Sequence, residues 1–222
     1  MRFGLNVINA WPAEYLLQLA IAADNSGWDG FFLWDHVAFE FPATLQDPWV
    51  LLGAIAARTS RLRLGTLVTP LARRRPHVVA KETVTLDHLS KGRSVLGVGL
   101  GGTELEFAAF GDEVDAKIRA ERLDEALEVI TKLWSGEHVE HYGRYYTVSR
   151  ISFAPTPVQK PRIPIWVGGH SKAAQRRASR YDGWAPGGTA PSVGEAGMGL
   201  EELRESIAYI LKHREKGNLE PF

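Results

Sequence analysis

Runs of apolar and β-branched residues recur along the chain and predict buried strands. Four of them, at residues 3–8, 31–34, 61–69 and 94–99, precede residue 135. A short apolar run without polar alternation is typical of a strand covered on both faces, and such strands belong to parallel sheets. Between the runs, apolar residues recur every three or four positions, as in amphipathic helices. The alternation therefore predicts four strand–helix units joined by crossover helices.

Capping signals set the limits of these helices. Asp47 and Pro48 form an N-cap and first-turn pair for a helix that extends to Arg58, and Gly92 is a stop signal for a helix that begins at Pro76. The buried stripes of the third and fourth helices are expected to comprise Val78, Val79, Leu86 and Leu89, and Leu123, Ala126, Leu127, Ile130, Leu133 and Trp134.

The pattern changes between residues 136 and 162, where we expect an insertion within a single domain of residues 1–222. Tyrosines around Gly143 favour a small hairpin, and four prolines from Pro155 to Pro164 predict an irregular return. Strands are then expected at 163–167 and 182–186, with Ser171 capping a helix between them and a last helix following. About six βα units are predicted in all.

The glycines at 97, 99 and 102 match the G-x-G-x-x-G spacing of a dinucleotide-binding turn. That interpretation also requires an acidic residue about 20 residues further on, at the end of the next strand. The corresponding region of this chain has the apolar spacing of a helix instead. A glycine-rich strand end in another α/β fold is therefore favoured over a Rossmann fold.

Composition narrows the range of functions. The 222 residues carry a formal net charge of zero and include no cysteine. Neutral charge gives no sign of nucleic-acid binding, and the lack of cysteine excludes disulfides and thiolate chemistry. With no signal-type or membrane-length apolar run, we expect a soluble cytoplasmic protein that does not bind a membrane. His138, Glu140 and His141 lack a third ligand at useful spacing, so no metal site is expected.

Unusual residues follow five of the predicted strands. They are Asn6, Asp35 and His36, the segment 66–69, the segment 99–104 and the segment 168–171. In a (βα) barrel the carboxyl ends of the strands form the active-site mouth. We therefore predict an α/β fold of the TIM-barrel type in which these residues meet at one rim.

The same residues resemble the bacterial luciferase-like monooxygenases, which use flavins or the deazaflavin coenzyme F-420. The resemblance extends from Phe3 to about Leu219. The motifs that carry it are Leu-Trp-Asp35-His36, Leu64-Gly-Thr-Leu-Val-Thr-Pro70, Leu96-Gly-Val-Gly-Leu-Gly-Gly-Thr-Glu104 and Pro164-Ile-Trp-Val-Gly-Gly-His-Ser171, followed by Asp182-Gly-Trp. The set in this order is specific, whereas each motif alone is not.

The resemblance implies a coenzyme site, either for coenzyme F-420 or for FMN. Gly168, Gly169 and Ser171 would hold the coenzyme phosphate, which agrees with the affinity of a helix N-terminus for anions; the alternative is a plain turn and cap. A non-proline cis peptide is expected at Thr66-Leu67. The full implied coenzyme-binding set is Asn6, Thr66, Leu67, Val68, Gly99, Gly101, Gly102, Gly168, Gly169, His170 and Ser171.

The resemblance also assigns catalytic roles. His36 is expected to act as general acid/base with Asp35 orienting it, and Glu104 to contact the coenzyme or substrate. The alternatives are a loop cap for Asp35, a satisfied buried side chain for His36 and a solvated helix start for Glu104. Arg73-Arg74-Arg75 is by default a solvated loop, with phosphate binding as its alternative because a helix start follows.

The predicted function is hydride transfer between a deazaflavin or flavin and a small organic substrate. Its rivals are an FMN-dependent monooxygenase that uses molecular oxygen and a non-catalytic flavin-binding protein. The sequence ends where a seventh strand is expected, so the chain is either a fragment or a shortened relative whose barrel is incomplete. Exposed strand edges of an open barrel favour a homo-oligomer.

Overall fold

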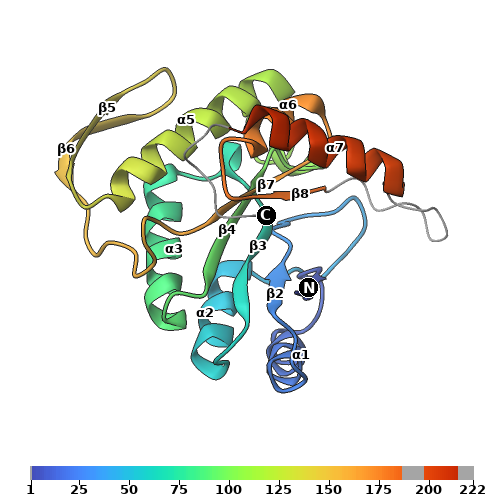
Figure 1. Ribbon diagram of the computed structural model, residues 1–222. Coiled ribbons are helices and arrows are strands. Elements are labelled where there is room, and N and C mark those ends of the chain that lie inside the picture. Colours follow the sequence, from blue (N-terminus) through green and yellow to red (C-terminus); the bar gives the residue numbers. More distant parts are fainter. Residues whose placement is uncertain (1, 187–197, 215–222) are drawn as a thin grey trace.

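A six-stranded parallel sheet forms the centre of the molecule. The computed structural model describes residues 2–186 and 198–214. The sheet order is β1-β2-β3-β4-β7-β8, and every pair of neighbours is parallel. The strand bounds are β1 Gly4–Val7, β2 Gly30–Leu33, β3 Arg63–Pro70, β4 Ser94–Gly99, β7 Ile165–Gly168 and β8 Gly183–Ala185. All carboxyl ends therefore lie at one edge of the sheet (Figure 1).

The helices form one layer in the same order as the strands. Their bounds are α1 Ala13–Asn25, α2 Pro48–Arg58, α3 Pro76–Ser90, α4 Leu105–Ala108, α5 Ala116–Trp134, α6 Lys172–Ala178 and α7 Leu200–His213, and the short 3₁₀ helix η1 covers Leu71–Arg73. Helix α1 packs against α2, α2 against α3 and α3 against α5. Crossover helices on a single face bend a parallel sheet into a barrel wall, so the described chain is an open half-barrel. The predicted fold class is confirmed.

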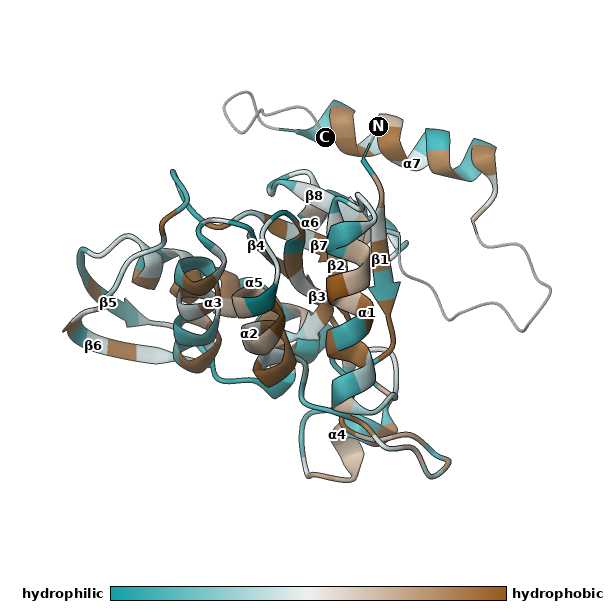
Figure 2. Cartoon of the chain, turned by 90° about the horizontal axis from the view of Figure 1, so that it is seen from below, coloured by the Kyte–Doolittle hydropathy of each residue, from teal (hydrophilic) through white to brown (hydrophobic). Residues whose placement is uncertain are grey.

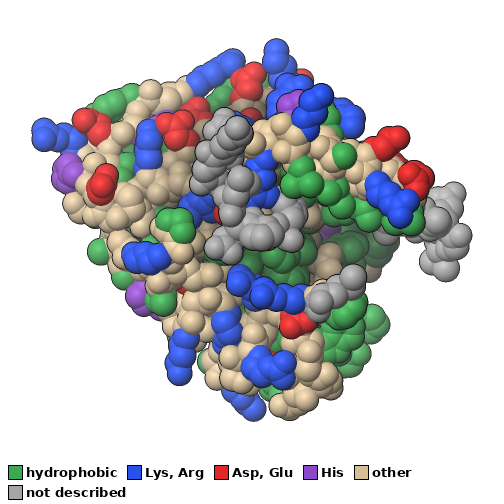
Figure 3. Space-filling view, viewed as in Figure 1, with side chains coloured by type: hydrophobic (Ala, Val, Ile, Leu, Met, Phe, Trp, Pro, Cys, Tyr) green, Lys and Arg blue, Asp and Glu red, His purple; other side chains and the backbone are tan. Residues whose placement is uncertain are grey.

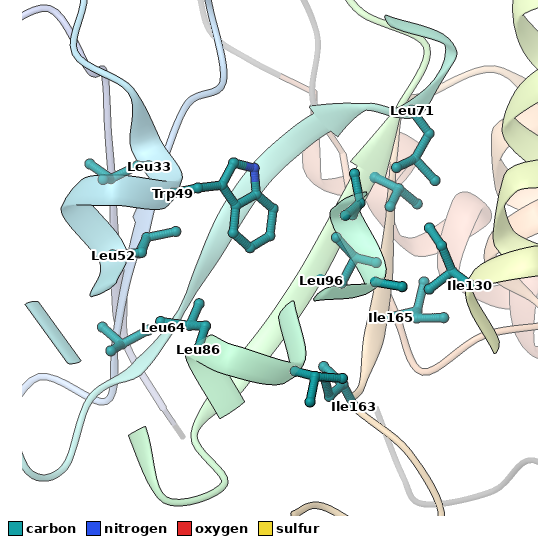
Figure 4. Packing of buried hydrophobic residues seen from close by; sticks show 14 of the residues in the cluster. Leu33, Trp49, Leu52, Leu64, Leu71, Leu86, Leu96, Ile130, Ile163 and Ile165 are labelled. Carbon is teal, nitrogen blue, oxygen red and sulfur yellow. The ribbon is translucent and has the colours of Figure 1, made fainter. Parts of the chain in front are cut away.

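The hydrophobic core lies between the helix layer and the sheet. Figure 4 shows Leu64 of β3 beside Leu86 of α3, and Ile130 of α5 beside Ile165 of β7. The helices carry both hydrophobic and hydrophilic residues, as Figure 2 shows for α1, α2 and α3. The predicted stripe of α5 is entirely buried. Among the described residues, no helix combines the length and the apolarity needed to cross a bilayer.

The predicted stripe of α3 is wrong at two positions. Val78 and Leu89 have exposed fractions of 43% and 48%, whereas Thr83, Asp87 and Ser90 are buried. The buried face of α3 is rotated away from the apolar stripe because Asp87 has partners across the interface. Its carboxylate accepts hydrogen bonds from Ser94 Oγ, from the Val158 and Gln159 N–H groups and from the Gln159 amide. A hydrogen-bonded carboxylate can be buried at little cost, so apolar periodicity alone misplaces the face.

The expected hairpin is present as a separate two-stranded antiparallel sheet, β5 His138–Tyr142 and β6 Thr147–Ser152. It projects from one side of the molecule beside α5 (Figure 1). Glu125 of α5 anchors its turn, since the Glu125 carboxylate accepts from the Tyr145 and Tyr146 N–H groups and lies 3.2 Å from His141 Nε2. His141 is thus engaged by an acid of the neighbouring helix.

Gly97 and Gly99 of the G-x-G-x-x-G match serve strand packing. Both lie inside β4. A Cβ at Gly97 would collide with the Thr66 carbonyl oxygen, and one at Gly99 would lie 2.6 Å from Val68 Cγ2. These glycines let β4 approach an irregular stretch of β3, where the pairing register shifts between Thr66 and Thr69.

Candidate active site

The carboxyl edge of the sheet brings the predicted residues to one rim. His36 follows β2 and Gly169 follows β7, with β3 and β4 between them. At a strand spacing of ~4.8 Å, these two strand ends are separated by roughly 14 Å across the rim. A planar coenzyme can span such a distance between its ring and its phosphate. His36 and the loop at Gly169 therefore lie at the same edge of the sheet.

Asp35 is one of two buried acids that the structure describes at this edge, with an exposed fraction of 2%. Arg74 binds it in a two-pronged pair, with Nε 2.9 Å from Oδ2 and Nη2 2.8 Å from Oδ1. The Thr69 hydroxyl donates to Oδ2 at 2.9 Å. Arg73 Nη2 donates to the Asp35 carbonyl oxygen at 2.6 Å. Asp35 therefore fixes the loop after β3 to the end of β2.

Arg73 continues this network to a second buried acid, Glu106 of α4. Arg73 Nη1 lies 3.3 Å from Glu106 Oε1, and both side chains are less than a tenth exposed. The same oxygen accepts from the Val37 N–H at 2.6 Å, and Oε2 accepts from the Thr103 hydroxyl at 2.9 Å. Glu106 Oε2 also lies 2.9 Å from His36 Nδ1. The carboxylate thus ties α4 to the loop after β2.

The surroundings of Glu106 keep it ionised. Burial alone would raise the pKa of this carboxyl group, but hydrogen bonds from His36 and Val37, with the charges of His36 and Arg73, lower it to about 2. A buried carboxylate that accepts several hydrogen bonds is stabilised in its charged form. Glu106 can therefore only accept hydrogen bonds at neutral pH.

This shift predicts an acid-dependent stability. Because the folded-state pKa of Glu106 lies below its ordinary value of 4.5, its contribution is present above pH 4.5 and is lost as the pH falls towards about 2. The shift corresponds to ~3 kcal/mol. We expect the free energy of unfolding of Glu106→Gln to fall less steeply than that of the wild type between pH 5 and pH 2, as measured by urea denaturation at a series of pH values. Parallel curves for the two proteins would contradict this assignment.

The ionised Glu106 determines the tautomer of His36. Since its carboxylate can only accept, Nδ1 of His36 carries a proton, and in the neutral imidazole Nε2 is the nitrogen with the lone pair. The imidazole ring contacts two aromatic rings, with its centroid 5.5 Å from that of Trp34 and 4.9 Å from that of Phe39. The side chain remains 21% exposed. His36 is therefore held in a fixed orientation with one nitrogen available to exchange a proton.

The sequence predicts that Asp35 orients His36, and this prediction is wrong because another acid contacts the imidazole. Asp35 bonds to arginines and Thr69, whereas Glu106 bonds to the imidazole. The side chain of Glu104 is exposed at the start of α4. Sequence reasoning missed Glu106, and it also missed Asn9. Asn9 is fully buried and donates to the carbonyl oxygens of His36 and Gln46, which holds the histidine loop in place.

The irregular part of β3 lies against the glycines of its neighbours. The expected non-proline cis peptide is present, but it joins Leu67 to Val68, one residue beyond the predicted position at Thr66-Leu67. Its position coincides with the register shift between Thr66 and Thr69. Cβ atoms at Gly99 and Gly168 would each lie 2.6 Å from a methyl group of Val68. Val68 therefore fills the space that these two glycines leave at the strand ends.

The other predicted coenzyme-binding residues lie in different environments. Thr66 is fully buried, and its hydroxyl lies 3.2 Å from the Gly97 carbonyl oxygen, within the sheet. Asn6 and Gly102 are exposed. Gly101 has a φ of 85°, and a Cβ there would crowd Phe107. Its conformation and close packing both favour glycine.

The loop after β7 combines a glycine turn with a helix start. Gly169 has a φ of 113°, and its N–H and carbonyl groups bond to β8 through the Ala185 carbonyl oxygen and the Trp184 indole N–H. Ser171 Oγ accepts from the Ala174 N–H and caps α6, while Gln175 donates to the His170 carbonyl oxygen. The turn-and-cap arrangement is thus present. A Cβ at Gly169 would lie 3.1 Å from Ala174 Cβ, so glycine suits this tight turn, and a helix start of the kind that favours anions follows it directly.

Comparisons with known proteins agree with this arrangement. Residues 1–214 match the family described as luciferase-like monooxygenase. An uncharacterised protein of Mycobacterium tuberculosis is 33% identical over 94% of this chain and 74% of its own length. An F420-dependent glucose-6-phosphate dehydrogenase of Nakamurella multipartita is 39% identical over 82% of this chain. This chain spans 54% of that dehydrogenase.

A solved structure resembles the half-barrel throughout the chain. The monooxygenase RslO1 from Streptomyces bottropensis superposes with a TM-score of 0.85 at 25% sequence identity. The match covers 100% of this chain and 68% of that protein. The relatives therefore contain additional length, and the described half-barrel corresponds to part of their fold.

Proposed function

Because the chain belongs to the luciferase-like monooxygenase family, we propose that it is an oxidoreductase that transfers hydride between coenzyme F-420 and a small organic substrate. The observation that carries the proposal is His36, whose Nδ1 is bonded to an ionised buried acid while the ring remains partly exposed at the carboxyl edge of the sheet. The similarity to an F420-dependent dehydrogenase favours the deazaflavin over FMN.

In this proposal, His36 moves a proton at Nε2 in step with the transfer of hydride. Bound at this edge, the coenzyme supplies or accepts the hydride. As a base, neutral His36 takes the proton of a substrate hydroxyl group as an alcohol is oxidised, and as an acid it returns that proton in the reverse direction. Glu106 stabilises the imidazolium that forms, because it is a carboxylate 2.9 Å from Nδ1. Trp34 and Phe39 restrict the access of water to the ring.

The coenzyme would lie along the strand ends, with its phosphate near Gly168, Gly169 and Ser171. These residues present a glycine turn and a capped helix start on the same edge as His36. Val68 offers an apolar surface between the two ends, since it packs against Gly99 and Gly168. The residues present therefore fit a planar, phosphate-bearing molecule.

A second candidate function is that of an FMN-dependent monooxygenase, favoured by the structural similarity to a monooxygenase over the whole chain. In that case the aromatic rings around His36 would protect a reactive intermediate from water. The residues around the rim select the substrate. This chain covers 54% of the dehydrogenase and 68% of RslO1, so both relatives have residues outside the matched part.

Cofactor titration distinguishes the two candidates. We expect coenzyme F-420 to bind the purified chain, with a change in its absorbance or fluorescence that saturates at one equivalent, and FMN to bind more weakly. This expectation rests on the resemblance of the Asp35-His36 segment to the deazaflavin enzymes and on the similarity to an F420-dependent dehydrogenase. Tight FMN binding with no response to coenzyme F-420 would reverse the order. A chain that bound neither would contradict the proposal.

A further inference from the structure

A cavity of about 230 Å³ lies beside the carboxyl rim, between the loop after β3, the first half of α5 and the turn of the β5–β6 hairpin. The side chains that matter on its lining are Arg73, Arg74, Arg75, Arg122, Asp112 and Tyr146. Four arginines and one acid surround this small space, so its lining is strongly basic.

Two of these arginines are already neutralised. Arg73 and Arg74 bind Asp35, and Arg74 also lies within 4.0 Å of Glu82. Arg75 and Arg122 differ. Within residues 2–186 and 198–214, neither has a carboxylate at ion-pair distance. The Nε atom of Arg122 is buried without a hydrogen-bond partner. A buried guanidinium nitrogen without a partner is costly unless a ligand satisfies it.

Arg75, Arg122 and the half-buried Tyr146 line the same cavity. Burial raises the pKa of the Tyr146 phenol, while the positive charges of Arg122 and Arg75 act to lower it. Arg122 also lies over the Tyr145 ring, with 5.5 Å between the guanidinium carbon and the ring centroid. The hairpin turn that carries both tyrosines is fixed to α5 by Glu125. The cavity is thus built on rigid elements and has two cationic side chains on its wall.

The volume of the cavity and the charges around it indicate which anion would fit. Its volume is below the roughly 300–1,000 Å³ of sites that hold larger organic ligands, so a single oxyanion group is the appropriate occupant. Basic and acidic side chains are interspersed over the face shown in Figure 3, and the chain has no net charge. A nucleic acid would require a continuous basic surface. Guanidinium groups match phosphate oxygens in geometry and charge.

We propose that Arg75, Arg122 and Tyr146 form a binding site for a phosphate group, carried either by free phosphate or by a small phosphomonoester. The site is distinct from the glycine loop after β7. It shares a wall with the network around Asp35, because Arg73 and Arg74 contribute to both. Asp112 opposes binding through its like charge and limits the affinity.

Calorimetric titration with inorganic phosphate and, separately, with glycerol 3-phosphate at low ionic strength tests the site. We expect the wild-type chain to bind at one equivalent and the Arg75→Gln/Arg122→Gln variant to bind at least ~10-fold more weakly, because charge-assisted hydrogen bonds are lost. Asp112→Asn is expected to bind several-fold more tightly. Tighter binding of glycerol 3-phosphate than of phosphate would identify a phosphomonoester, and the reverse order a free anion.

The control is Arg61→Gln, which removes one positive charge from an exposed side chain that lies before the opposite end of β3. It is expected to bind phosphate as the wild type does. The proposal would be overturned if this control bound phosphate as weakly as the double variant, or if the double variant bound phosphate with wild-type affinity. The double variant should keep the wild-type affinity for coenzyme F-420 or FMN, and loss of both affinities together would also overturn a separate site.

Discussion

Replacing His36 with alanine is expected to lower turnover by ~100-fold or more while leaving coenzyme affinity within about two-fold of the wild type. In the proposed function the imidazole exchanges the proton, and it is bonded through Nδ1 to Glu106 and is partly exposed at the rim. Its removal takes away the acid/base and leaves the glycine loop unchanged. Turnover would be measured with coenzyme F-420 and the substrate that gives the highest wild-type rate, and affinity by fluorescence titration.

Two further measurements make this test specific. Added imidazole is expected to restore part of the activity of His36→Ala, since it can enter the space left by the side chain. His138→Ala removes an exposed histidine of the hairpin that bonds to Ser152, and it should keep full activity. If His36→Ala turned over at the wild-type rate, the acid/base role would be removed and the case for a non-catalytic coenzyme-binding protein would be strengthened.

Replacing Asp35 with alanine is expected to have the largest effect on stability, a loss of about 3–5 kcal/mol in the free energy of unfolding. The carboxylate is buried and is the shared partner of Arg73 and Arg74, whose side chains are only 7% and 18% exposed. Without it, two largely buried cations lose their shared partner, and the loop after β3 loses its attachment to β2. Urea denaturation followed by circular dichroism measures the loss.

The control for this prediction is an exposed ion pair between a carboxylate and an arginine. Glu201 and Arg204 lie 2.6 Å apart on α7, with exposed fractions of 79% and 65%. Glu201→Gln should change the free energy of unfolding by less than ~1 kcal/mol, because solvent screens exposed pairs. Similar small changes in both variants would show that the Asp35 network contributes little to stability.

Some elements were predicted correctly from the sequence, whereas the buried face of α3 was not. Strand β4 occupies the predicted residues 94–99, and Asp47 caps α2 as expected, because burial on two faces and local capping both leave a pattern in adjacent residues. The stripe of α3 was misplaced because its buried polar residue Asp87 is satisfied by residues about 70 positions away. Hydrophobicity along one helix carries no information about such partners.

The sequence by itself determined the alternating strands and helices, the parallel sheet and the edge at which the candidate site residues lie, since each follows from short-range periodicity and from the common direction of parallel strands. Only the tertiary structure decided which acid serves His36. Glu104 and Glu106 are two residues apart in a short helix and thus point ~200° apart, and no local pattern distinguishes them. The bond between His36 and Glu106 joins residues 70 positions apart, so it exists only once β2 and the segment after β4 have been brought to the same rim.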